Sequence, residues 1–271
     1  MLPNTPLVRV VALGDIVGKA GRQCLKVFHH KIKSQYQPDI FIVNGENASG
    51  GFGISHKISR TFFEEYNCSV VTTGNHWADN RQIYDFKHEY PNLLIPANMF
   101  NAESLESGYF VGSTQNNISY AVVNLSGKVF MHPENSCPFQ YADKILRSIS
   151  QQTKIIIMDI HAEATSEKQA LAHYLSGKMS LVFGTHTHCQ TSDERILDSK
   201  TGYLTDLGMT GAYDSVIGME KNRSIHNFLE KNRKKMKPAQ DDLRLCGIYA
   251  EICPISGYCK KIERIHEKIA L

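Results

Sequence analysis

The sequence predicts an α/β fold built as a layered α/β sandwich, with mixed sheets flanked by helices. Three observations support this prediction. Short apolar runs rich in β-branched residues alternate with amphipathic segments of helical length. Helical segments separate the first three of these runs, an order typical of parallel strands. The last two runs are joined by the turn residues 254–257, which favours a closing antiparallel hairpin.

The elements follow in order along the chain. The first half is predicted to contain strands at 8–13, 40–43 and 69–72 and helices at 22–36 and 55–66. Leu25, Phe28 and Ile32 recur at spacings of three and four, which gives the first helix one apolar face. The second half is predicted to contain strands at 118–125, 155–158, 181–183, 203–205, 243–252 and 258–265. Ser166 and Gln169 form a capping-box pattern that predicts a helix start. The glycine-rich segments 50–53 and 208–211 are predicted to be loops, either plain turns or backbone cradles for phosphate.

Length and composition favour one domain spanning residues 1–271. A chain of 271 residues with 42% hydrophobic and 21% charged residues can bury a sizeable core undivided. The formal net charge of +3 neither requires nor excludes a nucleic-acid partner. Seven cysteines without a C-x-x-C pair argue against a disulfide framework and against a thiolate zinc site. Because the sequence has no signal-peptide pattern and no run of 18 apolar residues, we expect a cytoplasmic protein with no membrane partner.

Polar clusters occur where five of the predicted strands end. In α/β proteins such ends open into a shared crevice, so five converging clusters would make a metal site. Singly, each cluster has a plainer explanation: an Asp after a strand can cap a helix, and one buried histidine is more often a satisfied core residue. The clusters are Gly14-Asp15, Gly45-Glu46-Asn47, Gly74-Asn75-His76, Asp159-Ile160-His161 and Gly184-Thr185-His186-Thr187-His188.

The donor types in these clusters indicate which cations would bind. His186 and His188 are two residues apart, so an extended backbone would point both imidazoles to the same side. Carboxylates, amides and several histidines form a mixed nitrogen and oxygen set that suits Fe, Mn or Zn better than Ca or Mg. Cys189 would face the other way and is expected to be a packed thiol.

The ordered set G-D, G-E-N, G-N-H, D-x-H and G-T-H-T-H resembles the calcineurin-like metallophosphoesterase superfamily, and specifically its bacterial subfamily of cyclic-nucleotide phosphodiesterases. The resemblance covers nearly the whole chain. It implies a layered sandwich of the calcineurin-like type. It extends to segments that are more specific than the superfamily signature, namely residues 44–48, 96–98, 161–168 and 206–211.

The resemblance implies a binuclear centre with two metal ions per chain, Fe or Mn first and Zn as a further option. Glu46 would bridge the two ions, and His76 would stay free of metal and assist catalysis. The superfamily pattern has a histidine where this chain has Val17, and an Asp where it has Glu46. The implied ligands of one metal are Asp15, Asn47 and His188, and those of the other are Asn75, His161 and His186.

The implied activity is hydrolysis of phosphodiester bonds, with 2′,3′- and 3′,5′-cyclic nucleotides as the small-molecule substrates. A hydroxide held between the metals would attack phosphorus, and His76 would assist the leaving group. The same core can also support a phosphomonoesterase or nucleotidase. A third hypothesis is a regulatory, RNA-associated metal-binding protein with vestigial catalysis. The presence of His76 argues against it, because a protein without catalysis has no need of a free histidine beside its metals. The basic run 231–237 is consistent with RNA association, although a solvated helix end also explains it. The resemblance also allows a homo-oligomer.

Overall fold

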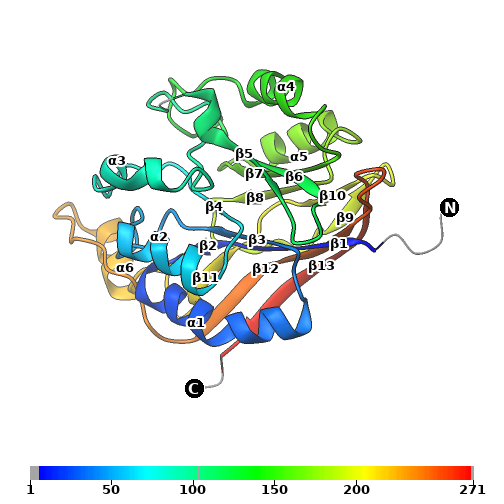
Figure 1. The fold of residues 1–271 in the computed structure, drawn as a ribbon. Coiled ribbons are helices and arrows are strands. Elements are labelled where there is room, and N and C mark those ends of the chain that lie inside the picture. The colour runs from blue at the N-terminus through cyan, green and yellow to red at the C-terminus, as the bar shows by residue number, and fades with distance from the viewer. Residues whose placement is uncertain (1–5, 103, 270–271) are drawn as a thin grey trace.

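The computed structural model describes residues 6–102 and 104–269, and in it two mixed β-sheets face each other between outer helices (Figure 1). The first sheet has the strand order β2-β11-β12-β1-β3-β4, with β13 paired to β12, and the second has the order β5-β6-β7-β8-β10-β9. The first sheet consists of β1 (Val8–Leu13), β2 (Asp15–Ile16), β3 (Ile40–Asn44), β4 (Val70–Thr72), β11 (Met209–Ala212), β12 (Leu243–Ile252) and β13 (Cys259–Lys268). The second consists of β5 (Tyr109–Ser113), β6 (Ser119–Ser126), β7 (Ile155–His161), β8 (Leu181–Thr185), β9 (Arg195–Leu197) and β10 (Thr201–Leu204).

Helices cover the outer face of each sheet. In Figure 1, α4 and α5 lie above the second sheet, whereas α1 and α2 lie below the first. The long helix α1 packs on β11 and β12, and α4 packs on β6. The α-helices are α1 (Gly18–Gln35), α2 (His56–Arg60), α3 (Ile83–Phe86), α4 (Pro138–Ile149), α5 (Thr165–Tyr174) and α6 (Lys221–Leu229). Shorter turns are the π-helix η1 (Thr61–Glu65) and the 3₁₀ helices η2 (Lys87–Glu89) and η3 (Leu105–Gly108).

Alternate residues of the central strands enter different cores, which explains why these strands are apolar throughout. In β1, Val10 and Ala12 face the space between the sheets, and Val11 and Leu13 face α1. Residues 155 and 157 of β7 lie in the same inter-sheet core, while 156 and 158 pack toward α4 and α5. Strands buried on both faces need no polar alternation.

The parallel strands bring distant parts of the chain to one edge of each sheet. In the first sheet β1, β3 and β4 are parallel, and in the second β6, β7, β8 and β10 are parallel. Their carboxyl ends carry the polar clusters. This topology therefore gathers residues far apart in sequence beside one another.

Most predicted elements are confirmed, but three differ. The first helix begins at Gly18 rather than at residue 22, because the Gly18 N–H is bonded to the Asn47 carbonyl at 2.9 Å. The helix predicted over 55–66 divides into α2 and η1. The loop predicted over 208–211 is wrong: residues 209–212 form β11, which lies between β2 and β12.

The capping box predicted at Ser166 is also wrong. Helix α5 begins at Thr165 after Ala164, and no side chain caps it. In the first turn of α5, the carboxylate of Glu167 accepts hydrogen bonds from the backbone N–H groups of Lys128 and Val129. Within the described part of the chain, no helix combines the length and apolarity that a membrane crossing requires.

Candidate metal centre

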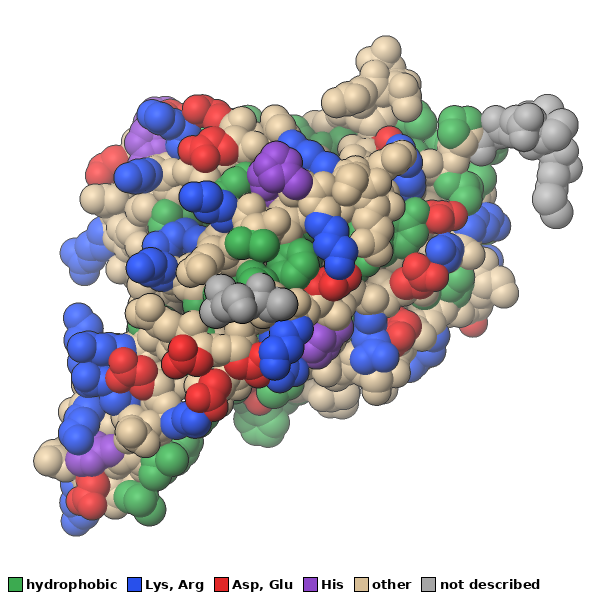
Figure 2. Space-filling model, turned by 90° about the horizontal axis from the view of Figure 1, so that it is seen from below, with side chains coloured by type: hydrophobic (Ala, Val, Ile, Leu, Met, Phe, Trp, Pro, Cys, Tyr) green, Lys and Arg blue, Asp and Glu red, His purple; other side chains and the backbone are tan. Residues whose placement is uncertain are grey.

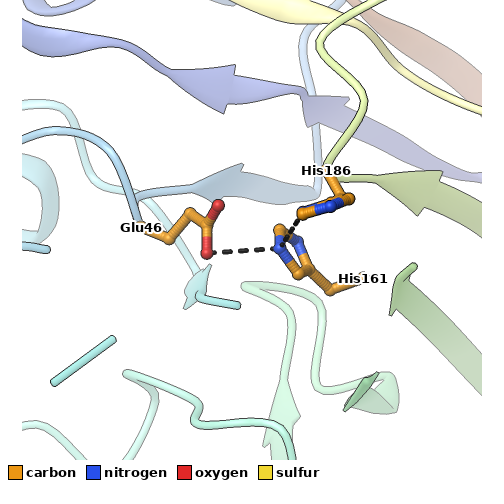
Figure 3. A group of neighbouring side chains, drawn as sticks. All are labelled: Glu46, His161 and His186. Atoms are coloured by element: carbon orange, nitrogen blue, oxygen red, sulfur yellow. Dashed lines mark hydrogen bonds and ion pairs between the residues drawn. The ribbon is translucent and has the colours of Figure 1, made fainter. Parts of the chain in front are cut away.

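The carboxylate and imidazole groups predicted as ligands converge in two groups that share Glu46. The donor atoms of each group lie within 4.8 Å of one another. Figure 3 shows the side chains of Glu46, His161 and His186 pointing toward a common point. We call Glu46, His161 and His186 group A, and Asp15, Glu46 and His188 group B. One carboxylate between two groups is an arrangement that can hold two cations side by side.

The two predicted amides join these groups, one each. Asn75 Oδ1 lies 2.9 Å from His161 Nε2 in group A. Asn47 Oδ1 lies 3.2 Å from His188 Nε2 in group B. Each group therefore offers carboxylate oxygen, amide oxygen and imidazole nitrogen, the mixed donor set that Fe, Mn and Zn accept.

Gly74 leaves the room that group A needs. A Cβ atom at this position would overlap the Glu46 carboxylate and the His161 imidazole. The absence of a side chain lets both groups approach the backbone after β4, which then continues into Asn75 and His76. A glycine is required here by space rather than by backbone conformation.

Each of the three histidines is held at its second ring nitrogen. Nδ1 of His161 lies 2.9 Å from the Thr185 hydroxyl. Nε2 of His186 lies 3.2 Å from a Glu163 carboxylate oxygen, and Nδ1 of His188 lies 2.9 Å from the Ile217 carbonyl. Oxygen partners of this kind fix the orientation and tautomer of metal-binding imidazoles. Sequence reasoning missed these roles of Thr185, Glu163 and Ile217, because only the fold brings them to the rings.

A fully buried carboxylate, Asp159, ties this arrangement to both sheets. It accepts hydrogen bonds from the Thr185 hydroxyl at 2.7 Å, the Thr72 hydroxyl at 2.5 Å and the Asn44 amide at 3.1 Å. Asn44 in turn accepts the backbone N–H of Glu46 at 3.1 Å. Burial raises the pKa of Asp159, and these hydrogen bonds oppose the rise. Asp159 belongs to neither group but supports two of their ligands indirectly, His161 through Thr185 and Glu46 through Asn44.

The charges within the centre fit cations. Burial raises the pKa of Asp15 to about 6, against the attraction of His188 and His161. Burial also opposes the charge of Glu46, yet the charge and hydrogen bond of His161 lower the pKa of Glu46 to about 2. No hydrogen-bond donor among the described residues reaches Oδ1 of Asp15, although this atom is buried. Buried carboxylates are stabilised by a cation at such positions.

The two histidines of group A differ in their protonation. Burial opposes the charged form of His161, but Glu46 raises the pKa of His161 to about 9. Burial and the neighbouring His161 lower the pKa of His186 to about 3. A proton on His161 and a metal ion would occupy the same place beside Glu46, so they compete.

The backbone carrying His186 and His188 is not the extended strand that the sequence predicted. Strand β8 ends at Thr185, and His186 and His188 have φ angles of 98° and 63°. Such angles in non-glycine residues cost about 1–3 kcal/mol each. The two side chains therefore reach neighbouring groups through a tight turn, and Cys189 is exposed rather than packed.

Asp206 holds this turn in place. Its Oδ2 accepts hydrogen bonds from the backbone N–H and the hydroxyl of Thr187, at 3.3 and 2.9 Å. The ammonium of Lys168 lies 2.6 Å from the same oxygen and also donates to the Thr185 carbonyl at 2.9 Å. Both Lys168 and Asp206 are fully buried. This pair compensates for the strain at the ligand-bearing turn.

His76 lies at the edge of the centre and belongs to neither group. Its backbone N–H donates to Glu46 at 3.2 Å. Its Nδ1 donates to the Asp79 carboxylate at 2.8 Å, and the Phe52 ring meets it edge-on at 5.0 Å between centroids. The side chain is 29% exposed, so substrate can reach it. Asp79 was missed from the sequence, although an Asp three residues after a turn histidine is a local signal.

Val17 offers no donor to group B. It is buried and lies where a Cβ on Gly218 would touch it. Group B is instead completed by the amide of Asn47, next to the bridging candidate Glu46. The departure from the superfamily pattern thus removes one imidazole and leaves an oxygen-rich group.

Comparisons with known proteins agree over nearly the full length. The profile of a family described as YmdB-like protein matches residues 11–265. A 2′,3′-cyclic-nucleotide 2′-phosphodiesterase of Bacillus subtilis (strain 168) is 39% identical over 258 residues, which cover 95% of this chain and 96% of that protein.

Two solved structures share the fold. A hypothetical protein from Thermus thermophilus superimposes with a TM-score of 0.87 at 32% identity, covering 96% of this chain and 99% of that one. A structure described as a novel phosphatase from Mycoplasma pneumoniae has a TM-score of 0.90 at 29% identity, covering 98% and 95%. The chain therefore belongs to the YmdB-like family of calcineurin-like metallophosphoesterases and is a hydrolase of that family.

Proposed function

We propose that this protein is a di-metal phosphodiesterase that hydrolyses cyclic nucleotides, of the 2′,3′ form first and of the 3′,5′ form as well. The observation that carries this proposal is the pair of ligand groups sharing Glu46, with His76 beside them. The Bacillus subtilis relative, a 2′,3′-cyclic-nucleotide 2′-phosphodiesterase, supports the substrate class.

The ligand assignment follows the two groups. Glu46, Asn75, His161 and His186 would hold one metal ion, and Asp15, Asn47 and His188 would hold the other together with Glu46. Two cations at these groups would supply Lewis acidity toward the phosphoryl oxygens and acidify water. Fe or Mn suits the donor set, and Zn is compatible with it.

His76 has the geometry of a proton donor to the leaving group. Asp79 holds its Nδ1, which leaves Nε2 available to the substrate. In the reaction, water oxygen forms a bond to phosphorus, the bond from phosphorus to the ribose 2′-oxygen breaks, and that oxygen takes up a proton. Transfer of this proton by a positioned histidine contributes about 10²–10⁴-fold to the rate.

The proposal is tested with Mn²⁺-loaded and chelator-stripped protein and with the variant His76→Ala. The substrates are bis-p-nitrophenyl phosphate, p-nitrophenyl phosphate and 2′,3′- and 3′,5′-cyclic AMP. Metal-dependent diester cleavage is expected. His76→Ala should retain its metals, and its kcat on the cyclic nucleotides should be about 10²–10⁴-fold lower than that of the wild type. The loss on the nitrophenyl diester is smaller, because nitrophenolate leaves without a proton. Equal activity of the variant and the wild type on cyclic nucleotides would remove His76 from the mechanism.

A phosphomonoesterase is the second candidate, because the solved Mycoplasma pneumoniae structure is described as a phosphatase. Cleavage of p-nitrophenyl phosphate alone, with no diester cleavage in the metal-loaded protein, would establish this alternative and reject the first.

A further inference from the structure

A basic groove runs between α1 and α2, on the side of the molecule away from the second sheet. Its volume is about 710 Å³. Its rim carries Lys19, Arg22, Lys26 and Lys57, and its floor includes the apolar side chains of Ile58 and Tyr66. No Asp or Glu lines it among the described residues. Figure 2 shows the face of the molecule below the first sheet, with Lys and Arg side chains gathered along its left side.

Three of the four cations of this rim are available to a ligand. Within residues 6–102 and 104–269, the exposed ammonium groups of Lys19, Lys26 and Lys57 enter no ion pair and no hydrogen bond given by the structure. Helix α1 carries five Lys or Arg residues over 18–35 and no Asp or Glu. A positive rim over an apolar floor suits a strand that presents phosphates to the cations and bases to the floor.

The groove and the metal centre lie on two sides of one loop, residues 47–53. The Arg22 guanidinium donates to the Ala48 carbonyl, and the Gly18 N–H donates to the Asn47 carbonyl at 2.9 Å. Asn47 is the amide of group B. The same loop carries Phe52, which is 37% exposed and contacts the His76 ring. One loop thus contacts His76 through the exposed Phe52 ring and the rim residue Arg22 through the Ala48 carbonyl.

We propose that this groove holds the nucleotides preceding a terminal 2′,3′-cyclic phosphate, so that the substrate class includes single-stranded RNA ends as well as cyclic mononucleotides. The proposal rests on the proposed phosphodiesterase function. A 2′,3′-cyclic phosphate needs a ribose 2′-oxygen, so the strand is RNA and not DNA. Pro238, the residue after the irregular basic segment 231–237, lies beside Gly18 at the start of α1.

The test compares 2′,3′-cyclic AMP with a tetra-adenylate that ends in the same cyclic phosphate, using the Mn²⁺-loaded full chain. The ratio of the two kcat/KM values is expected to favour the oligonucleotide about tenfold at low salt and to fall as salt rises. Three phosphate contacts on a single strand predict a slope of about −2 for the logarithm of this ratio against the logarithm of salt concentration.

The groove variant is Lys19→Gln/Lys26→Gln/Lys57→Gln, and its matched control is Arg147→Gln/Lys154→Gln/Lys260→Gln. The control removes the same charge near the opposite end of β7, because Lys154 precedes that strand and His161 ends it. Arg147 and Lys154 line one pocket with Tyr258, and the Lys260 ammonium lies over the Tyr258 ring. The groove variant is expected to lose the oligonucleotide preference and its salt slope, and the control to keep both. Equal preference in the two variants, or no preference in the wild type, overturns the proposal.

A binding measurement separates this proposal from the proposed function. Fluorescence anisotropy with a labelled tetra-adenylate 3′-phosphate needs no turnover. One outcome is that cyclic AMP is not hydrolysed, yet this RNA binds the wild type about tenfold more tightly than the groove variant. That result supports RNA binding in the groove and rejects the proposed phosphodiesterase function. If cyclic AMP is hydrolysed and the RNA binds both proteins equally, the groove proposal fails alone.

Discussion

The hydroxyl of Thr185 lies between the Nδ1 atom of His161, at 2.9 Å, and a carboxylate oxygen of Asp159, at 2.7 Å. All three side chains are fully buried. The hydroxyl can donate only one proton. Donation to the Asp159 carboxylate leaves its oxygen to accept the Nδ1–H of His161, which presents Nε2 to group A. The Thr185 hydroxyl therefore connects the candidate ligand His161 to the Asp159 carboxylate, with which His161 forms no hydrogen bond of its own.

Thr185→Val is predicted to weaken metal binding without unfolding the protein. Valine has nearly the same shape, but it leaves Nδ1 of His161 and one oxygen of Asp159 without their partner. The affinity for Mn²⁺ is expected to fall about 10–100-fold, as measured by titration of the stripped protein.

The control is Thr201→Val, the same change at a fully buried hydroxyl that donates to the Met179 carbonyl at 2.6 Å. It costs stability in the same way, about 1–3 kcal/mol for the unpaired group. Equal Mn²⁺ affinities in the two variants would show that the Thr185 hydroxyl does not position His161.

The alternation of apolar and helical segments predicted the layered fold and the convergence of the strand-end clusters, and the resemblance predicted how the ligands divide into two groups. The runs at 40–43 and 155–158 are apolar at every position, the pattern of strands buried on both faces. Parallel strands place the residues that follow them at one edge of their own sheet. Glu46 follows β3 of the first sheet and His161 ends β7 of the second, and the two side chains meet because the two sheets pack face to face.

Sequence reasoning could not predict the groups that support the ligands. Asp159 contacts hydroxyls and an amide from three other strands, and no local pattern encodes such contacts. The turn at His186 and His188 has positive φ angles without a glycine, so propensity suggested an extended strand there. Tertiary contacts from Asp206 override that local preference.

Asp79→Ala is predicted to lower turnover while leaving the metals in place. Without the carboxylate at 2.8 Å, the His76 ring loses the partner that orients it. We expect kcat on 2′,3′-cyclic AMP to fall roughly tenfold, less than for His76→Ala, with KM and metal content unchanged. The nitrophenyl diester should be nearly unaffected, and a similar loss on both substrates would contradict an orienting role toward the leaving group.

Lys168→Met is predicted to destabilise the metal-free protein strongly. The change leaves the Asp206 carboxylate buried without its cation, at a cost of about 3–5 kcal/mol. Lys168→Met/Asp206→Asn should lie closer to the wild type than the single variant, because it leaves no buried charge. Guanidinium unfolding of the three proteins measures the free energies. A double variant less stable than Lys168→Met would assign the cost to lost packing rather than to the charge.

Asp242→Asn is predicted to flatten the acid dependence of stability. The hydrogen bonds from Arg244 and Lys268 lower the pKa of Asp242 to about 2. Between this value and the ordinary one near 3.8, the unfolded chain binds the proton more readily. The contribution of Asp242 to stability is therefore complete above about pH 4 and is lost as the pH falls toward 2. Asparagine tolerates the φ angle of 54° at this position, so the backbone is kept. Urea midpoints at about pH 7 and about pH 2.5 should differ less in Asp242→Asn than in the control Asp241→Asn, and an unchanged acid dependence in Asp242→Asn would refute the prediction.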